Sequence, residues 1–244
     1  MSLLAAEFLK LRTTRTPWAL LAATVALTGL GVASAVVVGA DADLDLTGDR
    51  GVRSILAASA SGAVFVLILG IIVSAGEYRM WTSIDTFLTT PRRSRVIAVK
   101  ILTAALVGVA FGAASAGAAL LGAALAYRAK GFTFPLGSTE AWEGLGGSVL
   151  YATVFAALGA ATGSLVRNQV AAVVGWLAWF AVVEHVAVGF LPDLGRWLPA
   201  AAGRALVRAP GGELLDVPVA AAVLVGYAVV IAAAAIVTER YRDA

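Results

Sequence analysis

The chain has 244 residues, of which 60% are hydrophobic, and its mean hydropathy is +0.90. A water-soluble domain of this length could not keep so much apolar surface in solution, so the composition predicts an integral membrane protein. The absence of cysteine and the single histidine exclude disulfides, zinc–thiolate sites and a multi-histidine metal site within one chain. The net charge of +3 comes without a basic stripe interleaved with aromatic residues, so no nucleic-acid partner is expected.

The first predicted element is a short N-terminal helix that lies in the membrane interface. Its apolar residues share one helical face and its charged residues lie towards the other: Leu4, Phe8 and Leu11 against Glu7, Lys10 and Arg12.

Six apolar segments follow, each close to or above the roughly 20 residues that a membrane-spanning helix needs. They are Pro17–Val38, Ile55–Ala75, Ile97–Ala126, Gly147–Val166, Val170–Phe190 and Val217–Val237. The third is longer than a perpendicular crossing requires, so we expect it to tilt or to begin in the interface. The sequence therefore predicts one all-α transmembrane domain that occupies residues 1–244.

Only Arg167, Asn168 and Gln169 separate the fourth segment from the fifth. About 40 residues could not fit into a single crossing of a hydrocarbon core about 30 Å thick. We therefore interpret these three polar residues as the tight turn of a hairpin.

The orientation follows from the positive residues beside the spans, because lysine and arginine are retained on the cytoplasmic side. The side that holds both termini carries eleven of them and the other side seven. This ratio predicts a multi-pass protein of the cytoplasmic membrane with both termini in the cytoplasm.

The polar segment from Gly76 to Lys100 joins the second and third spans on the predicted cytoplasmic side. Helical spacing places Trp81, Ile84 and Leu88 on one face, and Pro91 stops the helix. A basic cluster follows, so one interpretation is a surface helix whose arginines bind anionic lipid headgroups.

The same segment resembles the cytoplasmic loop of permease subunits of type 2 ATP-binding-cassette exporters. Those loops begin with Glu and continue through Thr, Leu, Pro and Arg to a final Lys. In this chain Lys100 stands at the position of that final Lys. Trp81 stands where a Gly commonly precedes the Thr. The resemblance implies a coupling helix that docks on an ATPase subunit, with these contact residues: Glu77, Arg79, Trp81, Thr82, Leu88, Pro91, Arg93 and Arg95.

Two further stretches are similar to that family. Residues Glu7 to Trp18 resemble its amphipathic entry helix, and Phe190 to Leu206 resembles the short re-entrant helices before its last crossing. The resemblance implies an export function, a cytoplasmic ATP-binding subunit as partner, and a second permease subunit in a homodimer or heterodimer. ATP and magnesium are expected on the ATPase, with no cofactor bound by this chain.

Enzymatic activity is not expected from the chain itself. A P-loop needs Gly-Lys-Ser/Thr, and none of the lysines, Lys10, Lys100 and Lys130, follows a glycine. No Ser-His-Asp set or carboxylate pair stands out.

Glu184 and His185 are ionisable residues inside the fifth predicted span, and such residues mark functional sites by default. They could form a substrate or proton site in the bundle, an interhelical hydrogen bond, or a group that reaches towards the outer interface. A proton-coupled secondary transporter and a non-transporting scaffold are the alternatives to the exporter subunit.

Two pairs of glycines, Gly108 with Gly112 and Gly159 with Gly163, have the GxxxG spacing that permits close helix approach. We interpret them as packing positions within the chain. The alternative is that they form a dimerisation surface.

Overall fold

The computed structural model describes residues 3–41, 48–79, 93–131 and 139–241, and the regular elements within these ranges are all helical. Their bounds, in chain order, are α1 Leu3–Thr13, α2 Thr16–Asp41, α3 Asp49–Ala57, η1 Ala58–Ala60, α4 Ala63–Arg79, α6 Arg93–Ala129, α7 Thr139–Val166, α8 Gln169–Ala178, η2 Trp179–Glu184, α9 His185–Phe190, α10 Pro192–Gly195, α11 Pro199–Leu206 and α12 Val217–Tyr241.

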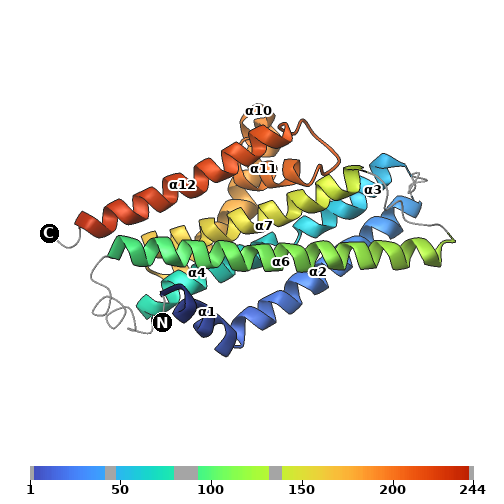
Figure 1. Ribbon diagram of the computed structural model, residues 1–244. Helices are drawn as coiled ribbons and strands as arrows, with labels where there is room; N and C mark the ends of the chain where they lie inside the picture. Colours follow the sequence, from blue (N-terminus) through green and yellow to red (C-terminus); the bar gives the residue numbers. More distant parts are fainter. Residues whose placement is uncertain (1–2, 42–47, 80–92, 132–138, 242–244) are drawn as a thin grey trace.

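Six stretches among the described residues are long and apolar enough to cross a membrane. They are Thr16–Val37, Gly51–Glu77, Ser94–Ala129, Ala141–Val166, Gln169–Phe190 and Val217–Glu239. Each overlaps one predicted segment, so the number and order of the apolar helices are confirmed. The third forms one continuous 37-residue helix, α6, which runs along the whole bundle (Figure 1). Its length of about 55 Å exceeds the thickness of the hydrocarbon core.

The centre of the bundle is α7, which packs against α4 on one side and α6 on the other. Gly159 and Gly163 of α7 meet the backbone of α4 at Leu67 and Ile71, where an added Cβ would clash. On α6, Gly108 and Gly112 meet α7 in the same way. Both GxxxG pairs therefore serve packing within the chain, as predicted.

The second span is not one continuous α-helix but is interrupted at η1, between α3 and α4. The Ser59 carbonyl accepts a hydrogen bond of 2.7 Å from the Ser115 hydroxyl of α6. The Thr28 hydroxyl of α2 lies 2.7 Å from the same Ser115 oxygen. Buried hydroxyl groups thus satisfy a backbone carbonyl that the interrupted helix does not.

The predicted hairpin between the fourth and fifth spans is confirmed. α7 ends at Val166, and α8 begins at Gln169. Asn168 caps α8 by accepting a 3.0 Å hydrogen bond from the Ala171 amide. Arg167 has a positive φ of 56°, and its guanidinium bonds to Glu239 near the end of α12. The turn is thereby attached to the C-terminal helix.

The helices reverse direction so that both ends of the described chain lie at the same end of the bundle (Figure 1). This end, which we call the terminal end, also holds the end of α4, the start of α6 and the α7–α8 turn. The short helices α10 and α11 lie away from this end, beside α7 and the start of α12 (Figure 1). α11 is almost wholly buried, because Gly203 accommodates the Tyr151 ring and Gly147 of α7 accommodates the Leu206 backbone.

Candidate functional site

Four charged side chains form a ring at the terminal end of the bundle. Glu7 and Lys10 come from α1, Glu77 from the last turn of α4, and Lys100 from the second turn of α6. Residues 80–92, which contain most of the predicted coupling helix, lie in the chain between Glu77 and Lys100. The ring therefore joins the end of α4 and the start of α6, which flank that segment in the sequence, to the N-terminal helix.

Each lysine of this ionic ring contacts both carboxylates. The Lys10 ammonium lies 2.9 Å from Glu7 and 2.7 Å from Glu77. The Lys100 ammonium lies 3.1 Å from Glu7 and 2.7 Å from Glu77. Two positive and two negative charges alternate around the ring, so its net charge is zero.

Burial differs strongly around the ring. The side chains of Glu7 and Lys100 are 4% and 6% exposed, whereas Lys10 is half exposed. Charges this deeply buried are tolerated only when they are paired, because transfer of a lone ion out of water is costly. Three helices must therefore keep their positions together for any one of these charges to be accommodated.

Lys10 is the most exposed member of the ring. Burial alone would lower its pKa, but hydrogen bonds to Glu77 and Glu7 and their negative charges outweigh burial and hold the pKa above the ordinary value of 10.5. Since the pKa is raised on folding, the stability that Lys10 contributes is fully present below pH 10.5 and is lost only as the pH rises through the higher, folded-state pKa. Lys10 is thus a charged member of the ring at neutral pH.

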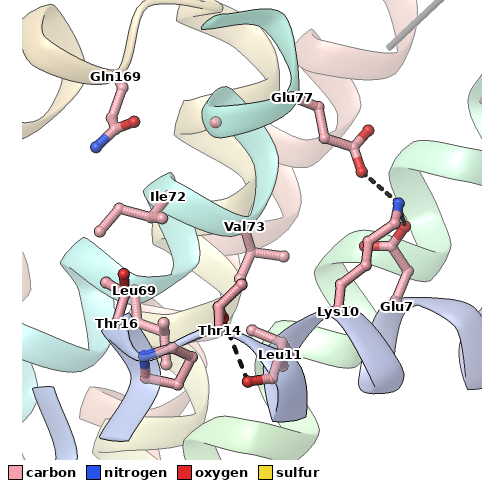
Figure 2. A pocket seen from close by; sticks show the side chains of 12 residues that line it. Glu7, Lys10, Leu11, Thr14, Thr16, Leu69, Ile72, Val73, Glu77 and Gln169 are labelled. Atoms are coloured by element: carbon pink, nitrogen blue, oxygen red, sulfur yellow. Dashed lines mark hydrogen bonds and ion pairs between the residues drawn. The ribbon is translucent and has the colours of Figure 1, made fainter. Parts of the chain in front are cut away.

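A cavity of about 390 Å³ adjoins the ring, between α1, the start of α2, α4 and the α7–α8 turn (Figure 2). Glu7, Lys10 and Glu77 form its polar edge, and Gln169 lies across from them. The remaining wall is mostly apolar, with Leu69 and Val73 of α4 prominent in it. This cavity is open beside α1, so the helix is not packed against the bundle along its whole length.

One of the predicted coupling residues belongs to the ionic ring, and three others lie at the helix ends beside it. Glu77 belongs to the ring, Arg79 is the last residue of α4, and Arg93 is the first residue of α6. Arg95 is exposed on the first turn of α6. The other four predicted contact residues, Trp81, Thr82, Leu88 and Pro91, lie outside the described residues.

Sequence spacing missed the role of α1 in the ring. It placed Glu7 on the polar face of an interfacial helix, but Glu7 is only 3% exposed and faces Lys100. The available signal was the scarcity of lysine in the sequence, since two of its three lysines meet here. Lys100 was named only through the resemblance of the loop.

Glu184 and His185, the predicted intramembrane polar residues, have different surroundings in the structure. Glu184 is 4% exposed, and His185, the next residue, is exposed on the outside of the fifth span. The Glu184 carboxylate accepts hydrogen bonds from the Trp179 indole at 3.0 Å and from the Ala200 amide at 3.0 and 3.1 Å. Ala200 lies in the first turn of α11, so Glu184 caps that helix.

The local backbone explains how Glu184 reaches these partners. Residues Trp179–Glu184 form a π-helix, η2, in which residues five apart stack on the same side. Trp179 and Glu184 are five residues apart and would diverge on an α-helix. The π-turn therefore brings the indole N–H of Trp179 within hydrogen-bonding distance of the Glu184 carboxylate.

No group of three or more histidine, cysteine or acidic side chains that could hold a metal ion occurs among the described residues. No protein-family model matches the chain, and no curated protein sequence matches it either.

Proposed function

We propose that this chain is the membrane-spanning permease subunit of an ATP-binding-cassette exporter. The observation that carries the proposal is the ionic ring of Glu7, Lys10, Glu77 and Lys100. It joins both ends of the loop that resembles a coupling helix, and it joins that loop to α1. A loop that only connected two spans would not need three helices bound together by buried charges.

The ring offers a path for mechanical coupling. Glu77 lies two residues before the end of α4, and Lys100 lies seven residues after the start of α6. Because these two side chains are bound at 2.7 Å, a force applied to residues 80–92 would move α4 and α6 together. Both helices pack on α7, so the displacement would reach the centre of the bundle.

The exposed side of α1 supports an interfacial position on the cytoplasmic leaflet. Phe8 and Leu9 are 37% and 50% exposed, and Arg12 and Arg15 are exposed nearby. Apolar side chains beside arginines suit the boundary between acyl chains and anionic headgroups. In this proposal both termini are cytoplasmic, and ATP and magnesium bind on the partner ATPase.

The Glu184 contact supports a re-entrant position for α11. Glu184 is six residues from the end of α9 at Phe190, which corresponds to a depth of about 9 Å along a helix. Because the first turn of α11 bonds to Glu184, α11 would dip into the membrane from the outer side and return. The first, fifth and sixth spans bury little of their surface within the subunit, which leaves apolar faces for lipid and for a second permease subunit.

The decisive experiment is co-purification of the tagged chain from its native membranes under mild detergent. We expect a P-loop ATPase to co-purify with it, and the purified pair to hydrolyse ATP. If the chain is isolated without any P-loop ATPase, or if such a partner gains no turnover from it, the proposal is wrong.

A pair of variants tests the docking segment directly. Trp81→Ala combined with Leu88→Ala should abolish co-purification, because these residues share the predicted docking face. The matched control combines Trp142→Ala with Leu125→Ala, which are 58% and 68% exposed near the opposite end of the bundle. This control should retain the ATPase. Equal recovery with both double variants would contradict the coupling assignment.

A further inference from the structure

A second cavity, of about 330 Å³, lies between the fifth and sixth spans, away from the ionic ring. α8 and η2 form one wall, α12 the other, α7 the floor, and Pro199 of α11 closes one end. Gly175 lines it, and a Cβ added there would meet no atom within 4 Å. The space is therefore a real gap between helices and opens towards the surroundings of the bundle.

The aromatic walls of this cavity present hydrocarbon and ring surface. The Trp176 indole N–H donates to the Thr162 hydroxyl at 3.2 Å, and that hydroxyl donates to the Leu158 carbonyl at 2.8 Å. The Trp179 indole N–H donates to Glu184. Since these polar groups are turned to partners in the protein, the cavity offers a water molecule few of the two to four hydrogen bonds that it needs.

The closed end of the cavity is held in place by Glu184. Its carboxylate bonds at the same time to Trp179, which lines the cavity, and to Ala200, which follows the lining residue Pro199. One buried acid thus joins the Trp179 side chain to the backbone next to Pro199. This gives a fixed end wall, although the fifth span packs sparsely on the rest of the subunit.

The dimensions suit one leaflet of a bilayer. Ala171 and Trp179 line the two ends of the α8–η2 wall and are eight residues apart, a rise of about 12 Å. Half of the hydrocarbon core is about 15 Å thick. The other end of the cavity lies at Val166, next to Arg167, whose guanidinium is one quarter exposed and paired with Glu239. The exposed part of this ion pair gives that end of the cavity a polar border at the level of the adjacent headgroup layer.

We infer that this cavity binds one acyl chain of a membrane phospholipid, with the headgroup on the Arg167 side and the chain end against Trp179 and Pro199. The occupant follows from the chemistry of the site: an apolar cavity between two membrane-spanning helices adjoins hydrocarbon, and the ion pair of Arg167 lies at the end nearest the headgroups, whereas the Glu184 carboxylate at the other end is buried and does not line the cavity. This inference does not depend on the export function. A lipid held here would fill the gap between two spans that barely touch each other.

The test uses the full chain reconstituted in phosphatidylcholine vesicles that contain a minor fraction of phosphatidylcholine with a photoreactive diazirine in one acyl chain. After irradiation, labelled residues are mapped by mass spectrometry. We expect labelling at Trp176 and Tyr227 in the cavity above that at Val182 and Val229, which lie on exposed faces of the same spans.

Gly175→Leu should fill the cavity without disturbing the fold, because the added side chain enters open space. Labelling at Trp176 and Tyr227 should then fall to the level of the exposed faces. The matched control is Gly226→Leu on α12, where an added Cβ also meets no atom within 4 Å and which does not line the cavity. It should keep the wild-type pattern.

Equal labelling of the two variants, or wild-type labelling in the cavity no higher than on the exposed faces, would overturn the inference. A second copy of the chain is the rival occupant. It would show as efficient cross-linking between subunits through Gly175→Cys, which is the only cysteine in that variant because the sequence has none. We expect no such cross-link.

Discussion

The four residues of the ionic ring depend on one another. Glu7 and Lys100 are nearly inaccessible to water, and each is accommodated because the other and a second opposite charge lie within hydrogen-bonding distance. Buried ion pairs of this kind add little net stability over apolar packing, but removal of one partner is costly because a buried charge is left behind. The ring therefore fixes the positions of α1, α4 and α6 relative to one another.

Lys100→Met should be strongly destabilising for this reason. Glu7 and Glu77 would then share the single, half-exposed ammonium of Lys10, and two carboxylates would face each other in a buried site. Loss of one member of a buried pair typically costs about 3–5 kcal/mol. The measurement is the free energy of unfolding in detergent micelles, or the melting temperature where unfolding is irreversible.

Lys130→Met is the matched control, because Lys130 directly follows α6 at its other end and is exposed. Its unfolding free energy should stay within about 0.5 kcal/mol of wild type. Adding Glu77→Gln to Lys100→Met removes the second carboxylate charge and should recover part of the lost stability. If the double variant were no more stable than Lys100→Met alone, the pairing in the ring would not be the cause.

At the scale of elements, α11 depends on a residue from another helix. α11 begins with Pro199 and has no side-chain cap of its own, so its first amides need an acceptor from elsewhere. Glu184 supplies both a hydrogen-bond acceptor and a negative charge at the positive end of the helix dipole. The fifth span and the short helix are thereby connected by one carboxylate.

Two substitutions at Glu184 should separate these contributions. Glu184→Gln keeps an oxygen that can accept from Ala200 but loses the charge, whereas Glu184→Ala loses both. Loss of a helix cap costs about 0.5–2 kcal/mol, so hydrogen exchange of the α11 amides should accelerate in the order wild type, Gln, Ala. The exchange of α4, which lies outside this contact, provides the internal reference. Unchanged exchange of α11 in Glu184→Ala would contradict the capping role.

An element can be predicted from the sequence when the residues that cause it are neighbours in the chain. The α7–α8 turn was predictable because three consecutive polar residues, Arg167, Asn168 and Gln169, interrupt an apolar run that is too long for one crossing. The π-turn could not be predicted, because residues 179–184 are compatible with an α-helix. Only contact with α11 favours the extra residue per turn. For the same reason the break at η1 gave no signal, since its carbonyl is satisfied by Ser115 from a distant part of the sequence.

At the scale of the whole molecule, the six apolar helices were predictable because bilayer thickness sets their length and hydrophobicity. The ionic ring was not, because Glu7 and Lys100 are 93 positions apart and meet only once α1 has packed against α6. The spacing of residues along α1 placed Glu7 on the face exposed to water, whereas Glu7 is buried against Lys100. Helical spacing contains no information about which charged residue has a buried partner.

The arrangement of the helices also yields a prediction about topology. Since both described ends of the chain share one end of the bundle, residues from the terminal end and the opposite end should face opposite sides of the membrane (Figure 1). The excess of lysine and arginine at the terminal end favours the cytoplasm for it.

Single cysteines can report this directly, because the sequence contains no cysteine that would give a background signal. Thr14→Cys and Arg95→Cys, exposed at the terminal end, should react with a membrane-impermeant maleimide only after the cells are opened. Lys130→Cys and Glu213→Cys, exposed at the opposite end, should react in intact cells. Labelling of all four positions in intact cells would indicate leaky membranes, and the reverse pattern would show that the charge rule gives the wrong orientation. Reaction of Thr14 and Lys130 from the same side would contradict the helix arrangement itself, because α2, α3–α4 and α6 separate them by three crossings.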